Sequence, residues 1–145
     1  RHVVGLVKDA LTKCGKTMRR TRVCVLGLSQ MTNAESVPKK IAGEIAGLLV
    51  ARGARVHFYD PFLSEEDLAD TELRLKKTFS EAIEGVDCVI VLTGHDQFRK
   101  LNLDRLRMMM KKASAVVDLV GVLEPGKVEK EGLVYRGLGR GVWTK

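Results

Sequence analysis

The sequence predicts an α/β fold, a three-layer sandwich in which helices cover both faces of a mostly parallel β-sheet. Short apolar runs without polar alternation are typical of parallel strands that are buried on both faces. Between these runs, apolar residues recur every three or four positions, as on one face of a helix. The two patterns alternate along 145 residues, which is enough chain for a single domain with its own core.

The first expected element is an amphipathic helix that ends near Gly15 and Lys16. Its apolar positions, spaced by three or four residues, are Val3, Val7, Ala10 or Leu11, and Cys14. Because this helix precedes the first strand, we expect its apolar stripe to need a partner outside the sequence. The chain opens on Arg1 rather than Met, and we therefore expect a fragment of a longer protein.

A buried strand and a long helix are expected next. The run TRVCVLGL at 21–28 is the pattern of a parallel strand covered on both faces. A polar loop then leads into a helix with Val37, Ile41, Ile45, Leu48 and Leu49 on one face. Ser36 is the expected N-cap, Pro38 suits the first turn, and Gly53 suits the C-cap.

The rest of the chain continues the alternation. The run RVHFY at 55–59 is a strand that Asp60-Pro61 ends. The further expected strands are 87–92, 113–120 and 133–138, and the further helical segments are 64–70, 80–83, 96–100 and 103–111. Without a repeat or an internal linker, these elements make one Rossmann-like sandwich.

The positive charge of the chain is concentrated at its start. Residues 1–22 hold seven Lys and Arg against Asp9 alone, a net charge of +6, and the whole chain carries +7. This distribution indicates a basic arm rather than a basic domain face, and it favours a solvated helix face over a nucleic-acid-binding arm. The arm alternative predicts salt-dependent DNA binding that truncation removes. We expect no nucleic-acid partner.

Neither a membrane partner nor a metal site is expected from the sequence. No apolar run approaches the ~20 residues of a membrane span, and no signal peptide is visible, so a cytoplasmic location is predicted. The cysteines, Cys14, Cys24 and Cys88, lack CxxC or zinc-ligand spacing. Structural thiols are therefore the favoured interpretation, and we expect no catalytic residue in this chain.

A ligand of such a sheet is expected beyond the carboxyl ends of the strands. That rim includes Gly27–Ser36, Asp60, Thr93–Phe98 and the segment after Asp118. The first loop leads into a helix amino terminus, which attracts phosphate. However, the sequence after the first strand is GLSQMT rather than GxGxxG, and GLGRG at 137–141 follows the final strand with no helix after it.

Two acidic positions on this rim have alternative interpretations. Asp60 stands where a ribose-binding acid would lie, but a turn at Asp60-Pro61 is favoured. His95 and Asp96 could form an acid–base pair; the favoured interpretation is that Asp96 caps a short helix while His95 lines the rim.

The chain resembles the UDP-binding domain of the UDP-glucose/GDP-mannose dehydrogenase family over nearly its whole length. The segments that carry the resemblance are KTMRRTRVCVLGLS, LLVARGARVHFYDP, EAIEGVDCVIVLTGHDQFRKLNLDRL, VVDLVGVLE and GLVYRGLGRG. The form YRGLGRG is most similar to members that oxidise UDP-N-acetylated hexosamines, particularly UDP-N-acetylmannosamine.

The resemblance implies a division of labour between domains. In the family, an amino-terminal domain binds NAD and a middle domain supplies the catalytic Cys. The sugar C6 alcohol is oxidised to a uronic acid, a precursor for polysaccharides. Residues 1–19 would be the end of a connecting helix at a homodimer interface, and residues 20–145 would bind the UDP-sugar and close on the other domains. Gly27, Ser29, Asn33, Lys39 and His95 would line the nucleotide site, and this part alone would be inactive.

The chain departs from the family where charges are expected. Met31 stands at a Lys position, Pro38 at an Arg position, and Val120 at the Arg of an Asp-Gly-Arg-Asn motif. Each lost charge-assisted contact corresponds to roughly 1.5–3 kcal/mol. Lys39 and Lys40 could compensate from the helix start. The alternative function is therefore a degenerate binding or assembly domain that has kept the fold and lost UDP recognition.

Overall fold

A five-stranded sheet forms the centre of the computed structural model, which describes residues 2–27, 39–61, 74–92 and 96–137. Its strands are β1 (Arg22–Leu26), β2 (Arg55–Tyr59), β3 (Cys88–Val91), β4 (Ala115–Asp118) and β5 (Val134–Gly137). Their spatial order is β2-β1-β3-β4-β5 and every neighbouring pair is parallel. The predicted mostly parallel sheet is confirmed.

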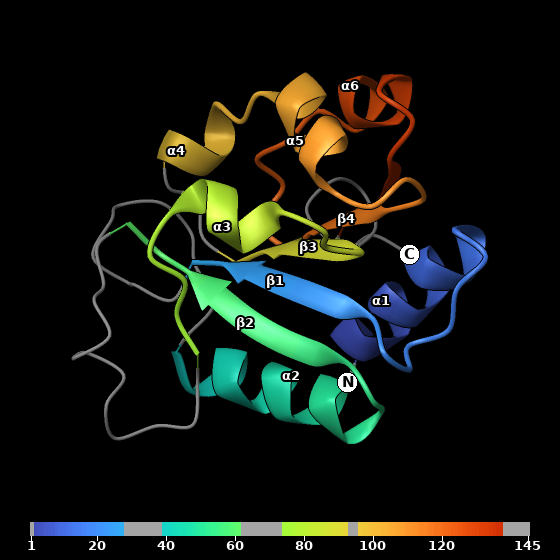
Figure 1. Ribbon diagram of the computed structural model, residues 1–145, viewed down its shortest axis with the longest axis vertical. Helices are drawn as coiled ribbons and strands as arrows, with labels where there is room; N and C mark the ends of the chain where they lie inside the picture. The colour runs from blue at the N-terminus through green and yellow to red at the C-terminus, as the bar shows by residue number, and fades with distance from the viewer. Residues whose placement is uncertain (1, 28–38, 62–73, 93–95, 138–145) are drawn as a thin grey trace.

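Helices cover both faces of this sheet (Figure 1). The helices are α1 (His2–Lys13), α2 (Lys39–Ala51), α3 (Phe79–Ile83), α4 (Asp96–Arg99), α5 (Leu103–Met109) and α6 (Pro125–Lys130). One apolar cluster joins α1 and α2 to one face of the sheet, and a second joins the opposite face to α3, α5 and α6. The three-layer α/β/α sandwich is therefore confirmed.

The continuous apolar strands divide their side chains between the two clusters. In β1, Val23 and Val25 belong to the cluster with α1 and α2, whereas Cys24 and Leu26 belong to the other. Successive side chains of a strand point to opposite faces, so a strand covered on both sides needs an apolar residue at every position. This requirement explains why the strands read as unbroken apolar runs.

The first helix lies where the sequence predicts it. The expectation that its apolar stripe needs a packing partner outside the sequence was wrong. α1 packs against β4, β5 and α2, and Val7, Ala10 and Leu11 are fully buried there. The apolar stripe thus finds its partner within the chain, because the sheet extends past β1 far enough to cover it. The division into residues 1–19 and 20–145 stays a prediction, although α1 belongs to the core.

The turns and short helices of the structure agree only in part with those predicted from the sequence. Gly53 follows α2 with φ of 99°, a left-handed conformation that suits glycine and confirms the predicted helix end. α6 was missed, because six residues with one buried side chain, Val128, are too few to show a helical period. Its Pro125 lies at the first turn, a position that suits proline. The predicted segment 64–70, with Ser36 and Pro38, lies outside the described residues.

No helix in the described ranges is both long and apolar enough to cross a membrane.

Candidate nucleotide site

The strand order of the sheet creates one place where a ligand can enter. From β1 the chain moves to β2 on one side, and from β2 it returns to β3 on the other side of β1. The helices that follow β1 and β3 therefore leave the sheet in opposite directions, which opens a crevice beyond the carboxyl ends of these two strands. In Figure 1 the arrowheads of β1 and β2 mark this side of the sheet. We call it the rim.

Gly27 is the described residue that leads from β1 onto the rim. It is buried, its φ is 102°, and its N–H donates a hydrogen bond of 2.8 Å to the Tyr59 carbonyl. A left-handed φ favours glycine, because a side chain would be strained in this backbone conformation. The structure thus places Gly27 where the sequence predicts a binding residue.

The other predicted binding residues are only partly placed. Ser29, Asn33 and His95 lie outside the described residues, as do Met31 and Pro38. Lys39 opens α2, and nothing is described of its side chain. The binding role of all five predicted residues stays a prediction.

Asp60, the candidate ribose-binding acid, directly follows β2. Its side chain is buried, at 4% exposure, and Pro61 continues into a turn. The turn that was preferred from the sequence is therefore present, and the ribose-binding role of Asp60 stays an untested alternative.

Asp118 organises the part of the rim that follows β4. It is fully buried, and Oδ1 accepts hydrogen bonds from the N–H groups of Val120 (3.2 Å) and Gly121 (2.8 Å). Oδ2 accepts from the Leu123 N–H at 2.8 Å and from the Tyr135 hydroxyl at 3.2 Å. A buried carboxylate needs such donors to offset its lost hydration. We call Asp118 and these four donors the Asp118 clamp.

The surroundings of the clamp bear on two sequence features: the glycine-rich run that begins at Gly137, and Val120 at a position where the family has Arg. A Cβ at Gly137 would lie 2.6 Å from the Tyr135 hydroxyl, so this glycine leaves room for the hydroxyl to reach Asp118. Val120 is half-buried and packs against the apolar cluster of α3, α5 and α6. Neither Gly137 nor Val120 presents a charged side chain to a ligand.

The segment after β3 is described from Asp96 onwards. Asp96 is the first described residue of α4, and nothing is described of its side chain, so its capping role stays a prediction. Phe98 is fully buried and anchors α4 against the sheet. The pairing of His95 with Asp96 lies outside the described residues.

The three cysteines are free thiols in apolar surroundings. Cys24 and Cys88 are fully buried, and burial raises the pKa of both thiols well above the ordinary value. Burial also raises the pKa of Cys14, although Lys16 partly opposes the effect. A thiol with a raised pKa holds little of the reactive thiolate at neutral pH. The described side chains include no His, Cys, Asp and Glu group that could hold a metal ion.

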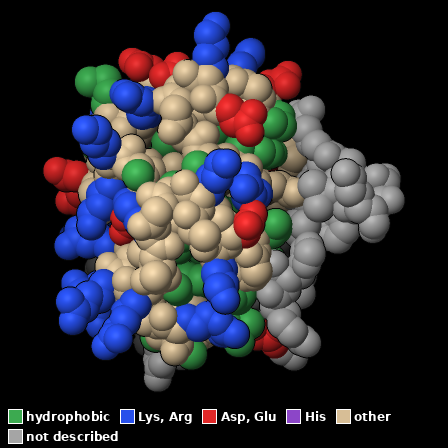
Figure 2. Space-filling model, turned by 90° about the vertical axis from the view of Figure 1, so that its right-hand side faces the viewer, with side chains coloured by type: hydrophobic (Ala, Val, Ile, Leu, Met, Phe, Trp, Pro, Cys, Tyr) green, Lys and Arg blue, Asp and Glu red, His purple; other side chains and the backbone are tan. Residues whose placement is uncertain are grey.

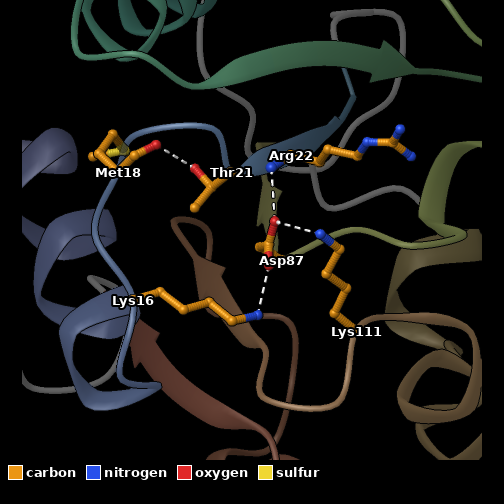
Figure 3. A network of polar contacts seen from close by, with 6 residues as sticks. All are labelled: Lys16, Met18, Thr21, Arg22, Asp87 and Lys111. Carbon is orange, nitrogen blue, oxygen red and sulfur yellow. Dashed lines mark hydrogen bonds and ion pairs between the residues drawn. The ribbon is translucent and has the colours of Figure 1, made fainter.

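A second buried carboxylate lies at the opposite edge of the sheet (Figure 3). Asp87 Oδ1 lies 2.5 Å from Lys16 Nζ, and Oδ2 accepts a 2.8 Å hydrogen bond from the Arg22 N–H. Lys111 Nζ lies 3.8 Å from the same Oδ2. Sequence reasoning placed Asp87 in a strand and missed this network, because its partners lie 65 and 71 residues away in the chain.

A comparison with known protein families decides the identity of this fold. The sequence profile described as "UDP-glucose/GDP-mannose dehydrogenase family, UDP binding domain" matches residues 24–125, which run from β1 to the start of α6. The chain belongs to this family. The resemblance of its sequence to the UDP-binding domain is thereby confirmed.

Known relatives agree with this assignment. A UDP-N-acetyl-D-mannosamine dehydrogenase of Methanococcus maripaludis is 28% identical over 98% of this chain and 32% of its own length. A UDP-glucose 6-dehydrogenase of Rhizobium meliloti is 30% identical over 92% of this chain and 30% of its own. The crystal structure of an NDP-N-acetyl-D-galactosaminuronic acid dehydrogenase from Methanosarcina mazei Go1 covers 96% of this chain and 29% of its own, at a TM-score of 0.84 and 26% identity. The family thus consists of oxidoreductases, and this chain spans about a third of the length of the curated relatives.

Proposed function

We propose that this chain binds the UDP part of a UDP-sugar at the rim, as the nucleotide-sugar domain of an NAD-dependent UDP-N-acetylhexosamine 6-dehydrogenase. The observation that carries the proposal is the family match at residues 24–125, because these residues include both strands that flank the crevice. We choose an N-acetylated hexosamine as the sugar because several relatives are UDP-N-acetyl-D-mannosamine dehydrogenases.

The chemistry of the rim supports a diphosphate as the bound group. α2, with 13 residues, begins after the β1 loop, and the free N–H groups of a helix amino terminus attract phosphate oxygens. In this proposal Gly27 allows close backbone approach, Ser29 and Asn33 donate hydrogen bonds, and Lys39 supplies positive charge. His95 lines the opposite side, after β3.

The rim of this chain lacks the glycine pattern that is typical of NAD-binding domains. The glycines that let a dinucleotide pyrophosphate approach the first turn form a GxGxxG pattern, and residues 27–32 read GLSQMT. The proposal therefore assigns NAD, and the cysteine that attacks the oxidised sugar carbon, to other domains of the parent enzyme. This chain would close over the nucleotide and hold the sugar toward those domains, within a cytoplasmic homodimer that makes polysaccharide precursors.

Calorimetric titration with UDP tests the proposal. We expect saturable binding, and Lys39→Ala should weaken it by roughly 10–150-fold, the effect of one lost charge-assisted hydrogen bond. Lys8→Ala, an exposed change in α1, is the matched control and should leave the affinity unchanged. No heat change at millimolar UDP, with the chain folded, would contradict the proposal. Turnover of UDP-sugar and NAD by this chain alone would contradict the assignment of the catalytic groups to other domains.

The second candidate is a degenerate domain that keeps the fold and has lost UDP recognition. It is favoured by Val120, which packs into an apolar cluster at a position where a charged side chain would face the ligand. This function would be supported if UDP caused no heat change in the same titration while a cooperative thermal transition showed that the chain is folded.

A further inference from the structure

The edge of the sheet at which the strands begin carries a dense group of cations, which we call the basic edge. Its members are Lys13, Lys16, Arg19, Arg20, Arg22, Arg52, Arg55, Arg107, Lys111 and Lys112, and all but the half-buried Lys16 are exposed. Backbone hydrogen bonds bring the segments together, from Arg20 to Gly53, from Arg55 to Thr21 and from Lys111 to Val86. Figure 2 looks onto this side and shows Lys and Arg side chains spread over it.

This basic edge corrects the expectation of a basic arm without a basic domain face. Half of its members, from Arg52 onwards, come from outside residues 1–22. The acidic side chains near Arg22 are Glu81 and Glu84, which line one hollow with it, and Asp87, which is buried between two lysines. The net charge of residues 23–145 does not reveal such a face. Acidic residues of the same segment cancel the cations in the sum, although most of them lie elsewhere on the fold.

Helix ends explain only some of these cations. Lys13 and Arg107 lie in the last turns of α1 and α5, where the helix dipole favours positive charge, and Arg52 donates a hydrogen bond to the Leu48 carbonyl at 3.3 Å. The side chains of Arg19, Arg20, Arg22, Arg55 and Lys112 form no ion pair with the described part of the chain. Because like charges repel one another, binding of an external anion would stabilise this face.

The shape and composition of the basic edge indicate the kind of anion. The cations lie before β1, β2 and β4 and at the ends of helices in both outer layers, so they cover a broad face rather than a single line. Val50 and Met108, 54% and 71% exposed, are the exposed large apolar side chains of the described residues. They lie in the last turns of α2 and α5, on opposite sides of this face.

We propose that the basic edge docks on an anionic lipid surface. A broad cationic face attracts anionic headgroups, and flanking apolar side chains can enter the headgroup layer. Bases of single-stranded nucleic acid stack on exposed aromatic rings, and the described part of this face offers none. The sequence-based expectation of no membrane partner rested on spanning segments and signal peptides, not on surface charge. Docking by this edge leaves the rim, at the other end of the strands, directed into water.

Co-sedimentation with lipid vesicles tests this inference. The full chain should bind vesicles in which phosphatidylglycerol replaces part of the phosphatidylcholine, should not bind pure phosphatidylcholine, and should dissociate as salt is added. The triple variant R19E/R55E/K112E should bind at least roughly a hundredfold more weakly. Replacing Val50 and Met108 by Ser should weaken binding further at high salt, where the apolar contribution remains.

The control is a triple variant with the same change in charge, K8E/K77E/K100E. Its exposed lysines lie outside the basic edge: Lys8 is within α1, Lys77 follows the contact of Leu75 with Phe58 near the end of β2, and Lys100 follows α4. Circular dichroism checks that both triple variants are folded. Retained vesicle binding by the control and lost binding by R19E/R55E/K112E supports the inference. Equal losses in both, no vesicle binding by the native chain, or tighter binding to duplex DNA than to vesicles at the same salt concentration would overturn it.

Discussion

Single buried carboxylates hold the loops at both ends of this sheet. Asp118 is fully buried and binds four donors on the rim side, while Asp87 binds a backbone N–H and two lysines on the basic edge. In each case the carboxylate replaces its lost hydration with hydrogen bonds from segments that must stay in place. These two side chains therefore determine the local geometry of both proposed surfaces.

Removal of the Asp118 carboxylate should destabilise the chain strongly. We expect Asp118→Ala to lower the free energy of unfolding by about 3–5 kcal/mol, because the buried Leu123 N–H and Tyr135 hydroxyl and two part-buried N–H groups lose their acceptor. Tyr135→Phe removes one donor and should cost about 1–1.5 kcal/mol. Urea unfolding measures both values.

The matched control for this experiment is Asp104→Ala, an exposed aspartate in the first turn of α5. Its cost should stay below about 1 kcal/mol, since it loses only a helix-dipole interaction. If Asp118→Ala were no more costly than this control, the clamp would contribute no net stability.

At the scale of elements, α1 is joined to the rest of the fold by two ion pairs of very different burial. Lys16, just after α1, reaches Asp87, whose side chain is 3% exposed, at 2.5 Å. Asp9, within α1, meets Arg136 of β5 at 2.6 Å, and its side chain is 63% exposed. Similar lengths do not imply similar energies, because water screens the exposed pair and not the buried one.

These two pairs should therefore respond differently to the same substitution. Asp87→Asn should lower the free energy of unfolding by about 2–4 kcal/mol, because it leaves Lys16 and Lys111 without their carboxylate partner. Asp9→Asn should cost less than about 1 kcal/mol. Both values come from chemical denaturation, and a high-salt series adds a control: salt should reduce only the small Asp9 effect. Equal losses in the free energy of unfolding for the two variants would show that burial does not determine the strength of these ion pairs.

At the scale of the whole molecule, the fold was predictable and the site only in part. Apolar runs and helical periods placed all five strands and α1–α5, because burial on both faces forces these patterns into the sequence. The packing partner of α1 and the basic edge depend on strand order, which no local pattern contains. Likewise, the role of Asp118 requires Tyr135, 17 residues away. Gly27 lies at the end of β1 on the rim, as expected from the sequence, and its binding role stays a prediction.

The stability of the whole molecule should also fall in mildly acidic solution through His57. Burial lowers the pKa of this imidazole below its ordinary value of 6.5, and its Nε2 donates a 2.6 Å hydrogen bond to the Ala82 carbonyl. The unfolded chain binds the proton more readily than the folded chain does, so protonation favours unfolding. Above pH 6.5 the imidazole is neutral in both states, and its contribution to stability is fully present. This contribution is lost as the pH falls from that value through the lower folded-state pKa.

Thermal unfolding of the native chain and His57→Gln across this pH range provides the measurement. The melting temperature of the native chain should drop more steeply below pH 6.5 than that of the variant, which lacks the imidazole with the lowered pKa. Parallel profiles for the two proteins would show that His57 titrates normally.

The contact between α1 and β5 has a consequence for synthesis on the ribosome. Asp9 and Arg136 are 127 residues apart in the chain, and α1 packs chiefly on β4 and β5. At about 5–20 residues per second, the ribosome needs roughly 6–25 s to make the segment between them. During that time the nascent helix has emerged while the strands that cover its apolar stripe do not yet exist. The core around α1 can therefore be completed only after β4 and β5 have been made, and until then Val7 and Leu11 are available to chaperones.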